Sequence, residues 1–143
     1  MFDVKPITSR KETDCGPTCL KMLLNYYGME DIPLDQLIEE CQVDITGCTA
    51  KDVMRAGRLH GLDMKAYKCE AEDVLTSDRP SIVWWMYNHF VVYAGIDEET
   101  GKVVICNPDR GRYRISKSTF ASFYTGIAIC NGEMGDLPAG DDE

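Results

Sequence analysis

The sequence predicts an α+β domain in which N-terminal helices pack on a C-terminal antiparallel sheet. Apolar residues in the first half recur at helical spacing, whereas the second half contains short runs rich in Val, Ile, Tyr and Trp, which are typical of strands. Helices that precede the strands, rather than alternating with them, favour an antiparallel sheet covered by helices. The length of 143 residues suits one such domain.

Three helices are expected in the first half. Asp14 is a candidate N-cap for a helix over residues 15–27, which Gly28 would end. A second helix is expected to begin at Pro33, because proline is favoured in the first turn. A third is expected to follow Thr49, a residue type that caps helix N-termini.

The strand candidates lie in the second half and are interrupted by one short helix, expected over residues 118–124. The expected strands cover residues 64–67, 81–86, 89–96, 102–106, 112–115 and 126–128. After them the chain becomes acidic and rich in glycine, a composition that does not support a packed core. We therefore expect a globular domain over residues 1–131 and a flexible acidic tail or linker over residues 132–143.

Composition excludes several classes of partner. With 15 basic and 24 acidic residues the net charge is −9, which argues against binding to a nucleic-acid backbone. No apolar run approaches the roughly 18–20 residues of a membrane-spanning helix, so direct membrane insertion is not expected. The first residues also lack the apolar stretch of a secretory signal peptide. A cytoplasmic, reducing location is the resulting expectation.

The cysteines are expected to be thiols rather than disulfides or metal ligands. There are seven of them, an odd number, and no two are spaced as a CxxC pair. Only two histidines could complete a zinc site. We therefore expect no metal and no cofactor.

Cys15 is the candidate nucleophile. A cysteine in the first turn of a helix lies beside unpaired backbone N–H groups and the positive end of the helix dipole, and both favour the thiolate. The following residue, Gly16, is expected to leave room for a substrate backbone. The competing interpretation is that Cys15 is a structural cysteine like the other six.

His89 and Asn107 are the candidates for the base and the residue that orients it. His89 opens a strand of β-branched residues, and Asn107 ends the next strand along the chain. If residues 97–101 form a five-residue hairpin loop, Ile96 faces Lys102 and His89 lies on the same sheet face as Asn107, on its diagonal. Taken singly, His89 is better explained as a solvated strand-end residue, and Asn107 with Pro108 is often only a turn. The order Cys, His, Asn is that of papain-like proteases.

With these residues in view, the sequence resembles the C39 family of bacteriocin-processing cysteine peptidases. The resemblance runs from about Lys5 to Cys130 and rests on four motifs. They are the nucleophile helix ending in Tyr-Tyr-Gly, the His-Phe-Val-Val strand, the Asn-Pro pair with a following Gly, and a final Phe-xxx-Tyr-Thr-Gly. It implies a papain-like fold and a cysteine peptidase that cleaves a leader peptide after a Gly-Gly pair, by thioester acyl transfer. It also implies work at the cytoplasmic side of the membrane, coupled to export by an ABC transporter.

Two positions depart from the family pattern. The family usually carries Asp where Asn107 stands, and Asn serves the same orienting role in papain-like enzymes. The family also usually has a Gln six residues before the nucleophile, where its amide helps to bind the oxyanion, and here that residue is Ser9. We expect the segment 8–11 to border the Cys15 cleft, with Ser9, Arg10 or a neighbour replacing the amide.

Trp84 and Trp85 are candidates for the walls of a narrow slot for a Gly-Gly substrate, although packing in the core is the preferred interpretation. Two further functions stay open. One is a catalytically weak or inactive peptidase-like module that binds a leader or export substrate, which the missing Gln favours. The other is a transglutaminase-like or amidase activity that uses the same three residues.

Overall fold

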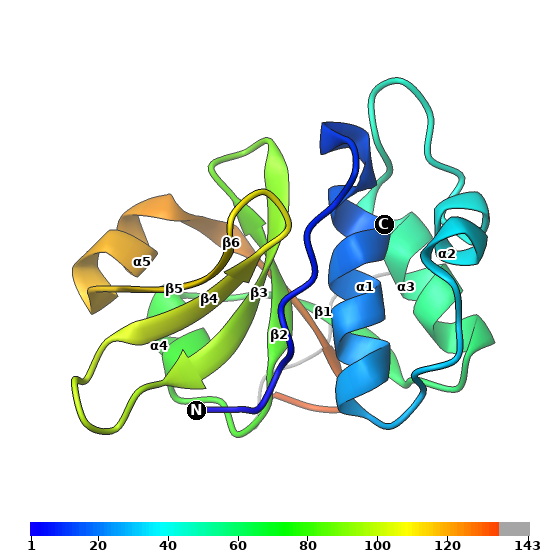
Figure 1. The fold of residues 1–143 in the computed structure, drawn as a ribbon. Helices are drawn as coiled ribbons and strands as arrows, with labels where there is room; N and C mark the ends of the chain where they lie inside the picture. Colours follow the sequence, from blue (N-terminus) through cyan, green and yellow to red (C-terminus); the bar gives the residue numbers. More distant parts are fainter. Residues whose placement is uncertain (135–143) are drawn as a thin grey trace.

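A computed structural model of the chain describes residues 1–134 and shows helices and strands segregated along the sequence (Figure 1). The first half contains a short 3₁₀ helix, η1 (Glu12–Asp14), and the helices α1 (Cys15–Tyr26), α2 (Leu34–Glu40) and α3 (Ala50–Leu59). The strands are β1 (Met64–Lys68), β2 (Ser81–Trp85), β3 (His89–Ile96), β4 (Val103–Asn107), β5 (Gly111–Ile115) and β6 (Tyr124–Asn131). Two short helices, α4 (Ala71–Leu75) and α5 (Lys117–Phe123), lie among the strands.

The strands form one six-stranded sheet in the order β1-β6-β2-β3-β4-β5, and every neighbouring pair is antiparallel. Helices α1, α2 and α3 lie on one side of this sheet, and α4 and α5 lie on the other (Figure 1). The α+β class with N-terminal helices on a C-terminal antiparallel sheet is therefore confirmed.

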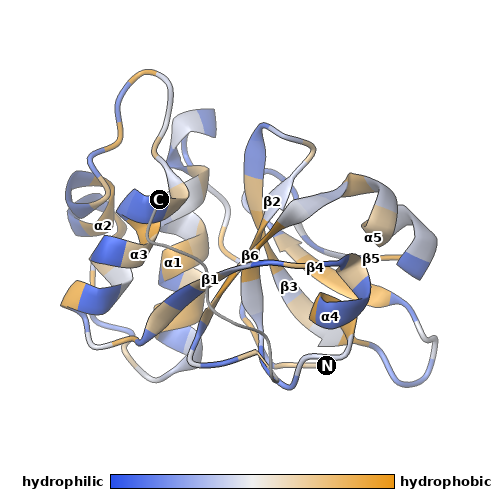
Figure 2. Ribbon diagram, turned by 180° about the vertical axis from the view of Figure 1, so that it is seen from behind, coloured by the Kyte–Doolittle hydropathy of each residue, from blue (hydrophilic) through white to orange (hydrophobic). Residues whose placement is uncertain are grey.

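The sheet separates two hydrophobic cores because successive residues of a strand point to opposite faces. Along β3, Phe90 and Val92 pack with the three N-terminal helices, whereas Val91 and Tyr93 pack with the core around α4 and α5. Burial on both faces explains why β3 and β4 are continuous apolar runs. In Figure 2 the central strands are mainly hydrophobic, whereas both colours alternate along α2 and α3.

The helix starts partly follow the sequence signals. Thr49 caps α3 as expected: its hydroxyl accepts from the backbone N–H of Asp52, and the Asp52 carboxylate accepts from the N–H of Thr49. Asp14 occupies the expected N-cap position of α1 but does not cap it with its side chain. Its side chain makes no capping bond, because η1 runs directly into α1 and Asp14 is the last residue of that 3₁₀ turn. Pro33 occupies the N-cap position of α2.

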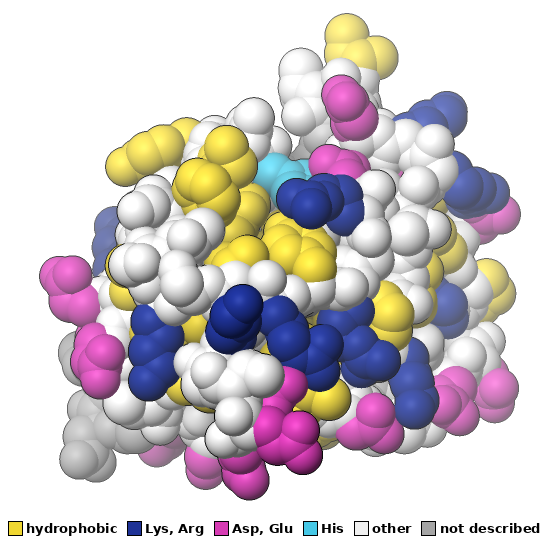
Figure 3. All heavy atoms as spheres, turned by 60° about the vertical axis from the view of Figure 1, so that its left-hand side comes forward, with side chains coloured by type: hydrophobic (Ala, Val, Ile, Leu, Met, Phe, Trp, Pro, Cys, Tyr) yellow, Lys and Arg dark blue, Asp and Glu magenta, His cyan; other side chains and the backbone are white. Residues whose placement is uncertain are grey.

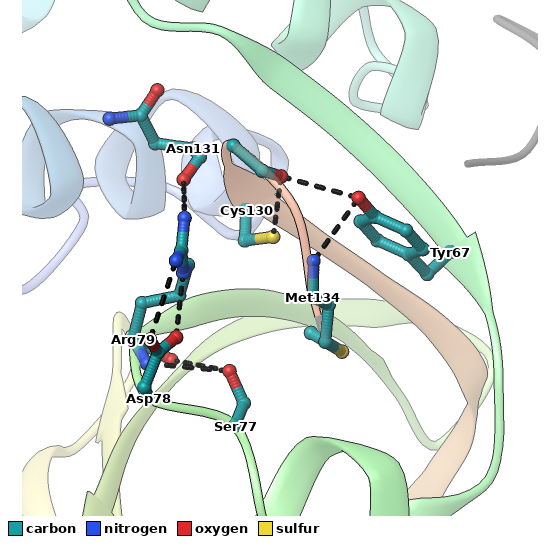
Figure 4. A network of polar contacts seen from close by, with 8 residues as sticks. Tyr67, Ser77, Asp78, Arg79, Cys130, Asn131 and Met134 are labelled. Carbon is teal, nitrogen blue, oxygen red and sulfur yellow. Dashed lines mark hydrogen bonds and ion pairs between the residues drawn. The ribbon is translucent and has the colours of Figure 1, made fainter. Parts of the chain in front are cut away.

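The strand β6 is longer than the expected residues 126–128 because it lies between β1 and β2 and is hydrogen-bonded on both sides. Its end is tied to the rest of the domain by the contacts in Figure 4. The Arg79 guanidinium donates to the Asn131 carbonyl at 2.9 Å, and the Tyr67 hydroxyl accepts from the N–H of Met134 at 3.2 Å. Met134 is only 2% exposed, so the packed chain continues past residue 131. The remainder of the expected tail, residues 135–143, lies outside the described residues.

The hairpin of β3 and β4 has the expected register at the end near His89 and Asn107, but a different register at its loop. Val92 pairs with Cys106 and Tyr93 with Ile105, as the five-residue loop required. At the loop, however, Ile96 pairs with Val103 rather than with Lys102. Between these pairs β3 has one residue more than β4, which forms a β-bulge. Gly95 lies in this bulge and has a positive φ of 93°. The bulge restores the parity that places His89 and Asn107 on one face.

Candidate active site

The partly exposed Cys15 is the first residue of α1, which packs against the sheet beside β3. The next residue, Gly16, is buried and faces protein rather than open space. A Cβ atom there would lie 2.7 Å from the Cys48 sulfur and 3.0 Å from a methyl group of Val53. The expected role of Gly16, to leave room for a substrate backbone, is therefore replaced by a packing role that lets α1 approach α3 closely.

His89 lies between the nucleophile candidate and Asn107. Its Nε2 is 2.9 Å from the Asn107 Oδ1, and Cys15 lies close enough to the ring to contribute to raising the pKa of His89. Because the amide oxygen can only accept, Nε2 donates. The neutral imidazole then has an unprotonated Nδ1, the form that can accept a proton from the thiol.

Asn107 is held in one orientation by its neighbours. It is 6% exposed, and its Oδ1 also accepts from the backbone N–H of Asp109 at 2.8 Å. Its Nδ2 donates to the Tyr113 hydroxyl at 3.1 Å. Because a backbone N–H can only donate, the bond from Asp109 identifies the amide oxygen, and the donor role of His89 follows from it.

Electrostatics around His89 favour its protonated form. Burial opposes the imidazolium, but the hydrogen bonds to Cys15 and Asn107, with the charges of Cys15 and Asp109, outweigh it and raise the pKa of His89. The Asp109 Oδ2 lies 3.5 Å from Nε2. Asp109 was not singled out in the sequence, although its position two residues after Asn107, in an Asn-Pro turn, was a usable signal.

The segment before the nucleophile borders the site through its backbone. The N–H of Ser9 donates to the carbonyl of Pro108 at 2.8 Å, which places Ser9 beside the Asn107 turn. Arg10 instead pairs with the Asp35 carboxylate on α2. Arg10 therefore has a partner away from the oxyanion, whereas the backbone of Ser9 lies beside the Asn107 turn.

The two tryptophans pack in the two cores, in accord with the preferred interpretation. The half-buried Trp84 lies against Phe90, with ring centroids 4.7 Å apart. The buried Trp85 packs on the opposite face against Phe120, at 5.5 Å.

The other six cysteines differ from Cys15 in their surroundings. Burial raises the pKa of Cys19 strongly, that of Cys69 less, and those of Cys106 and Cys130 to about 11. A hydrogen bond to the buried Cys41, together with burial, raises the pKa of Cys48. Within residues 1–134 no cysteine is in a disulfide, and no group of His, Cys, Asp and Glu is arranged to hold a metal ion.

The α+β fold and the Cys, His, Asn arrangement define a papain-like class of domain. The sequence matches the Peptidase C39 family over residues 3–133, so the chain belongs to that family. Among curated relatives, it is 26% identical over 125 residues to the colicin V secretion/processing ATP-binding protein CvaB of Escherichia coli. It is 29% identical over 131 residues to the lactococcin-G-processing and transport ATP-binding protein LagD of Lactococcus lactis subsp. lactis. Each alignment covers 87% of this chain and 18% of the relative, so the chain spans less than a fifth of their length.

Solved structures agree with this assignment. A double glycine motif protease from an AMS/PCAT transporter, in complex with its leader peptide, superposes with a TM-score of 0.84 at 32% identity, covering 90% of both chains. The peptidase domain of Streptococcus ComA, a bi-functional ABC transporter involved in quorum sensing, gives a TM-score of 0.80 at 25% identity, covering 89% of this chain and 96% of that one. Within the described residues, no helix has both the length and the apolar character needed to cross a membrane.

Proposed function

We propose that the chain is a cysteine peptidase that cleaves a leader peptide after a Gly-Gly pair, with Cys15 as nucleophile, His89 as acid and base, and Asn107 as the orienting residue. One observation carries the proposal: the Nε2 of His89 lies 2.9 Å from the Asn107 Oδ1, and Cys15 is close enough to the same ring to contribute to its raised pKa. The Gly-Gly substrate is supported by the similarity to the double glycine motif protease.

In the first half of the reaction, Nδ1 of His89 takes the thiol proton and the Cys15 sulfur attacks the scissile carbonyl carbon. The carbonyl oxygen becomes an oxyanion. When the tetrahedral intermediate collapses, the C–N bond breaks, the imidazolium gives its proton to the leaving nitrogen, and a thioester remains. In the second half, His89 removes a proton from water, which attacks the thioester and releases the Cys15 sulfur and the new carboxylate.

We further propose that this chain works beside or within an ABC transporter, at the cytoplasmic side of the membrane. The relatives named above are secretion, processing and transport ATP-binding proteins several times longer than this chain. A peptidase placed there would meet the precursor peptide before export.

Two measurements, thiol labelling and peptide cleavage, test the assignment of Cys15 as the nucleophile. Limiting iodoacetamide at neutral pH should label Cys15 before the other six cysteines, because it is partly exposed beside a histidine. Peptide mapping by mass spectrometry measures this order, and preferred labelling of Cys48 or Cys69 would contradict it. Cys15→Ala should lower the cleavage rate of a Gly-Gly leader peptide by at least about 10³-fold, with its folding checked by circular dichroism.

The binding-only module remains a second candidate because Ser9 stands where the family usually has the oxyanion-binding Gln. Loss of one such donor costs on the order of 10²–10³-fold in rate. Ser9 nevertheless lies beside the Asn107 turn, through its bond to Pro108. We therefore expect Ser9→Gln to preserve or raise cleavage of a Gly-Gly leader peptide. If wild type and Ser9→Gln bind the peptide tightly and neither turns it over, the binding module is the correct function.

A further inference from the structure

A cavity of about 440 Å³ continues from the candidate catalytic residues on the side of His89 and Asn107. The tip of the β2–β3 hairpin and Phe123 at the end of α5 form one part of its lining. The turn after β4 and side chains of β5 form another. Figure 3 shows hydrophobic and basic side chains gathered next to histidine on this face of the molecule.

The apolar wall of the cavity is held in place by an unusual turn. Met86 and Phe123 line it and are 53% and 37% exposed, which is high for large apolar side chains. The N–H of Met86 donates to the carbonyl of Phe123 at 2.8 Å, which fixes the hairpin tip to α5. Met86 and Tyr87 also have positive φ values of 54° and 62°, in a turn position that normally selects Asn and Gly. Strained conformations of this kind cluster at functional sites.

A second part of the lining is charged, and cations predominate. The Arg110 guanidinium lies over the Tyr113 ring at 4.4 Å, and both residues line the cavity. Arg114 also lines it and pairs with Asp97 at 2.7 Å. Asp109 supplies the only carboxylate among the lining residues, and it lies next to His89.

We propose that this cavity binds the first two residues after the scissile bond, and that it selects an apolar residue first and an acidic residue second. This inference rests on the function proposed above. His89 must give its proton to the leaving nitrogen, so the leaving segment of the substrate begins at the imidazole. Because His89 is itself part of the cavity lining, a segment that begins at the imidazole can enter the cavity directly. Met86 and Phe123 then contact the first side chain, and Arg110 attracts the second.

A substrate series tests the inference. The leader is kept constant through Gly-Gly, the first following residue is varied among Leu, Phe, Ser and Lys, and the second among Asp, Ser and Lys. We expect kcat/KM to be about tenfold higher for Leu than for Ser at the first position, the usual effect of filling an apolar pocket. Contacts to the leaving segment exist only until the C–N bond breaks. The preference among substrates should therefore appear in the acylation rate, which is the rate of thioester formation. The hydrolysis rate of the thioester, measured by single-turnover kinetics, should be the same for every member of the series.

Variants with matched controls assign the effect to the cavity. Met86→Ala should reduce the preference for Leu over Ser to about threefold or less. Tyr87→Ala, at the neighbouring position of the same turn, should leave it unchanged because Tyr87 does not line the cavity. Arg110→Glu should reverse the preference from Asp to Lys at the second position. Lys117 is an exposed cation of α5 that does not line the cavity, so Lys117→Glu should leave the preference at the second position unchanged.

A fluorogenic amide that carries the leader on a small coumarin amine separates the two proposals. This substrate has no residues after the scissile bond, so its cleavage requires only the catalytic residues. If the amide is not cleaved, the peptidase function itself fails and the inference fails with it. If the amide is cleaved but the series gives a flat kcat/KM, or if Met86→Ala and Tyr87→Ala behave alike, the peptidase function stands and the cavity is not a substrate site.

Discussion

At the scale of single residues, the candidate site depends on how Asn107 restricts His89. The amide oxygen accepts from both the imidazole Nε2 and the N–H of Asp109, and the amide nitrogen donates to the Tyr113 hydroxyl. The ring can therefore present only Nδ1 to the thiol. Asn107 contacts His89 through its oxygen rather than its nitrogen, so an aspartate at this position would keep the contact.

Substitutions at Asn107 should separate these contributions. Asn107→Ala removes a hydrogen bond to a group that becomes charged in the reaction, a loss of about 1.5–3 kcal/mol. We expect kcat/KM to fall roughly 10- to 150-fold. Asn107→Asp keeps the acceptor and should retain most of the activity. Tyr113→Phe, the control, should change kcat/KM by less than about threefold, since it removes only the outer partner.

The charge of Asp109 should be visible in the titration of His89. Asp109 contributes to the raised pKa of His89, so Asp109→Asn should lower that pKa. A histidine with a raised folded-state pKa stabilises the fold below its unfolded pKa of about 6.5 and loses this contribution as pH rises through the folded value. In Asp109→Asn, the contribution of His89 to the free energy of unfolding should therefore be lost at a lower pH than in the wild type. Proton NMR of the imidazole measures the shift, and Asp97→Asn, whose carboxylate pairs with Arg114 instead, is the control.

At the scale of elements, the bulge in β3 aligns the site. The N-terminal segment lies against it, with the N–H of Phe2 donating to the carbonyl of Ala94 at 2.8 Å. A Cβ atom on Gly95 would come within 2.9 Å of the Met1 Cα. Gly95 thus combines a left-handed conformation with close backbone contact, and both requirements exclude a side chain.

Gly95→Ala should therefore be more destabilising than an ordinary substitution at positive φ. We expect a loss of about 2–4 kcal/mol in the free energy of unfolding, from backbone strain plus the clash with the N-terminal segment. Gly101→Ala is the matched control. Gly101 also has positive φ, 71°, but nothing lies within 4 Å of the added Cβ, so only about 1 kcal/mol should be lost. Urea denaturation measures both, and equal losses would contradict the role of the N-terminal segment.

At the scale of the whole molecule, one sheet supports both cores, and the candidate site draws residues from both sides. Cys15 belongs to a helix on one face, whereas His89 and Asn107 have the strand parity of the other face. Because β2, β3, β4 and β6 contribute residues to both cores, neither core can lose its packing without exposing the other.

Unfolding of the domain should accordingly be a single cooperative transition. The near-ultraviolet circular dichroism of Trp84 and Trp85, one in each core, should change together with the far-ultraviolet signal of the helices. Heating or urea can be used, with both signals fitted independently. Two separated midpoints would show that the helical and sheet parts unfold as independent units.

The sequence by itself determined the fold class and the order of the three N-terminal helices and six strands, and it singled out Cys15, His89 and Asn107 as candidates; the short helix α4 was missed. Local signals are sufficient for these, because helical spacing, β-branched runs and caps such as Thr49 act over a few residues. The three candidates could be proposed because Cys15, His89 and Asn107 stand at the ends of elements, where side chains can meet.

Only the tertiary structure decided how those residues come together. The correct register at His89 required a bulge at Gly95 that compensates for a longer loop, and no local signal specifies both. The packing role of Gly16 depends on Cys48 and Val53, which are more than thirty residues away in sequence. Asp109 beside the imidazole and the ion pair of Arg10 depend in the same way on long-range packing, which sequence spacing does not encode.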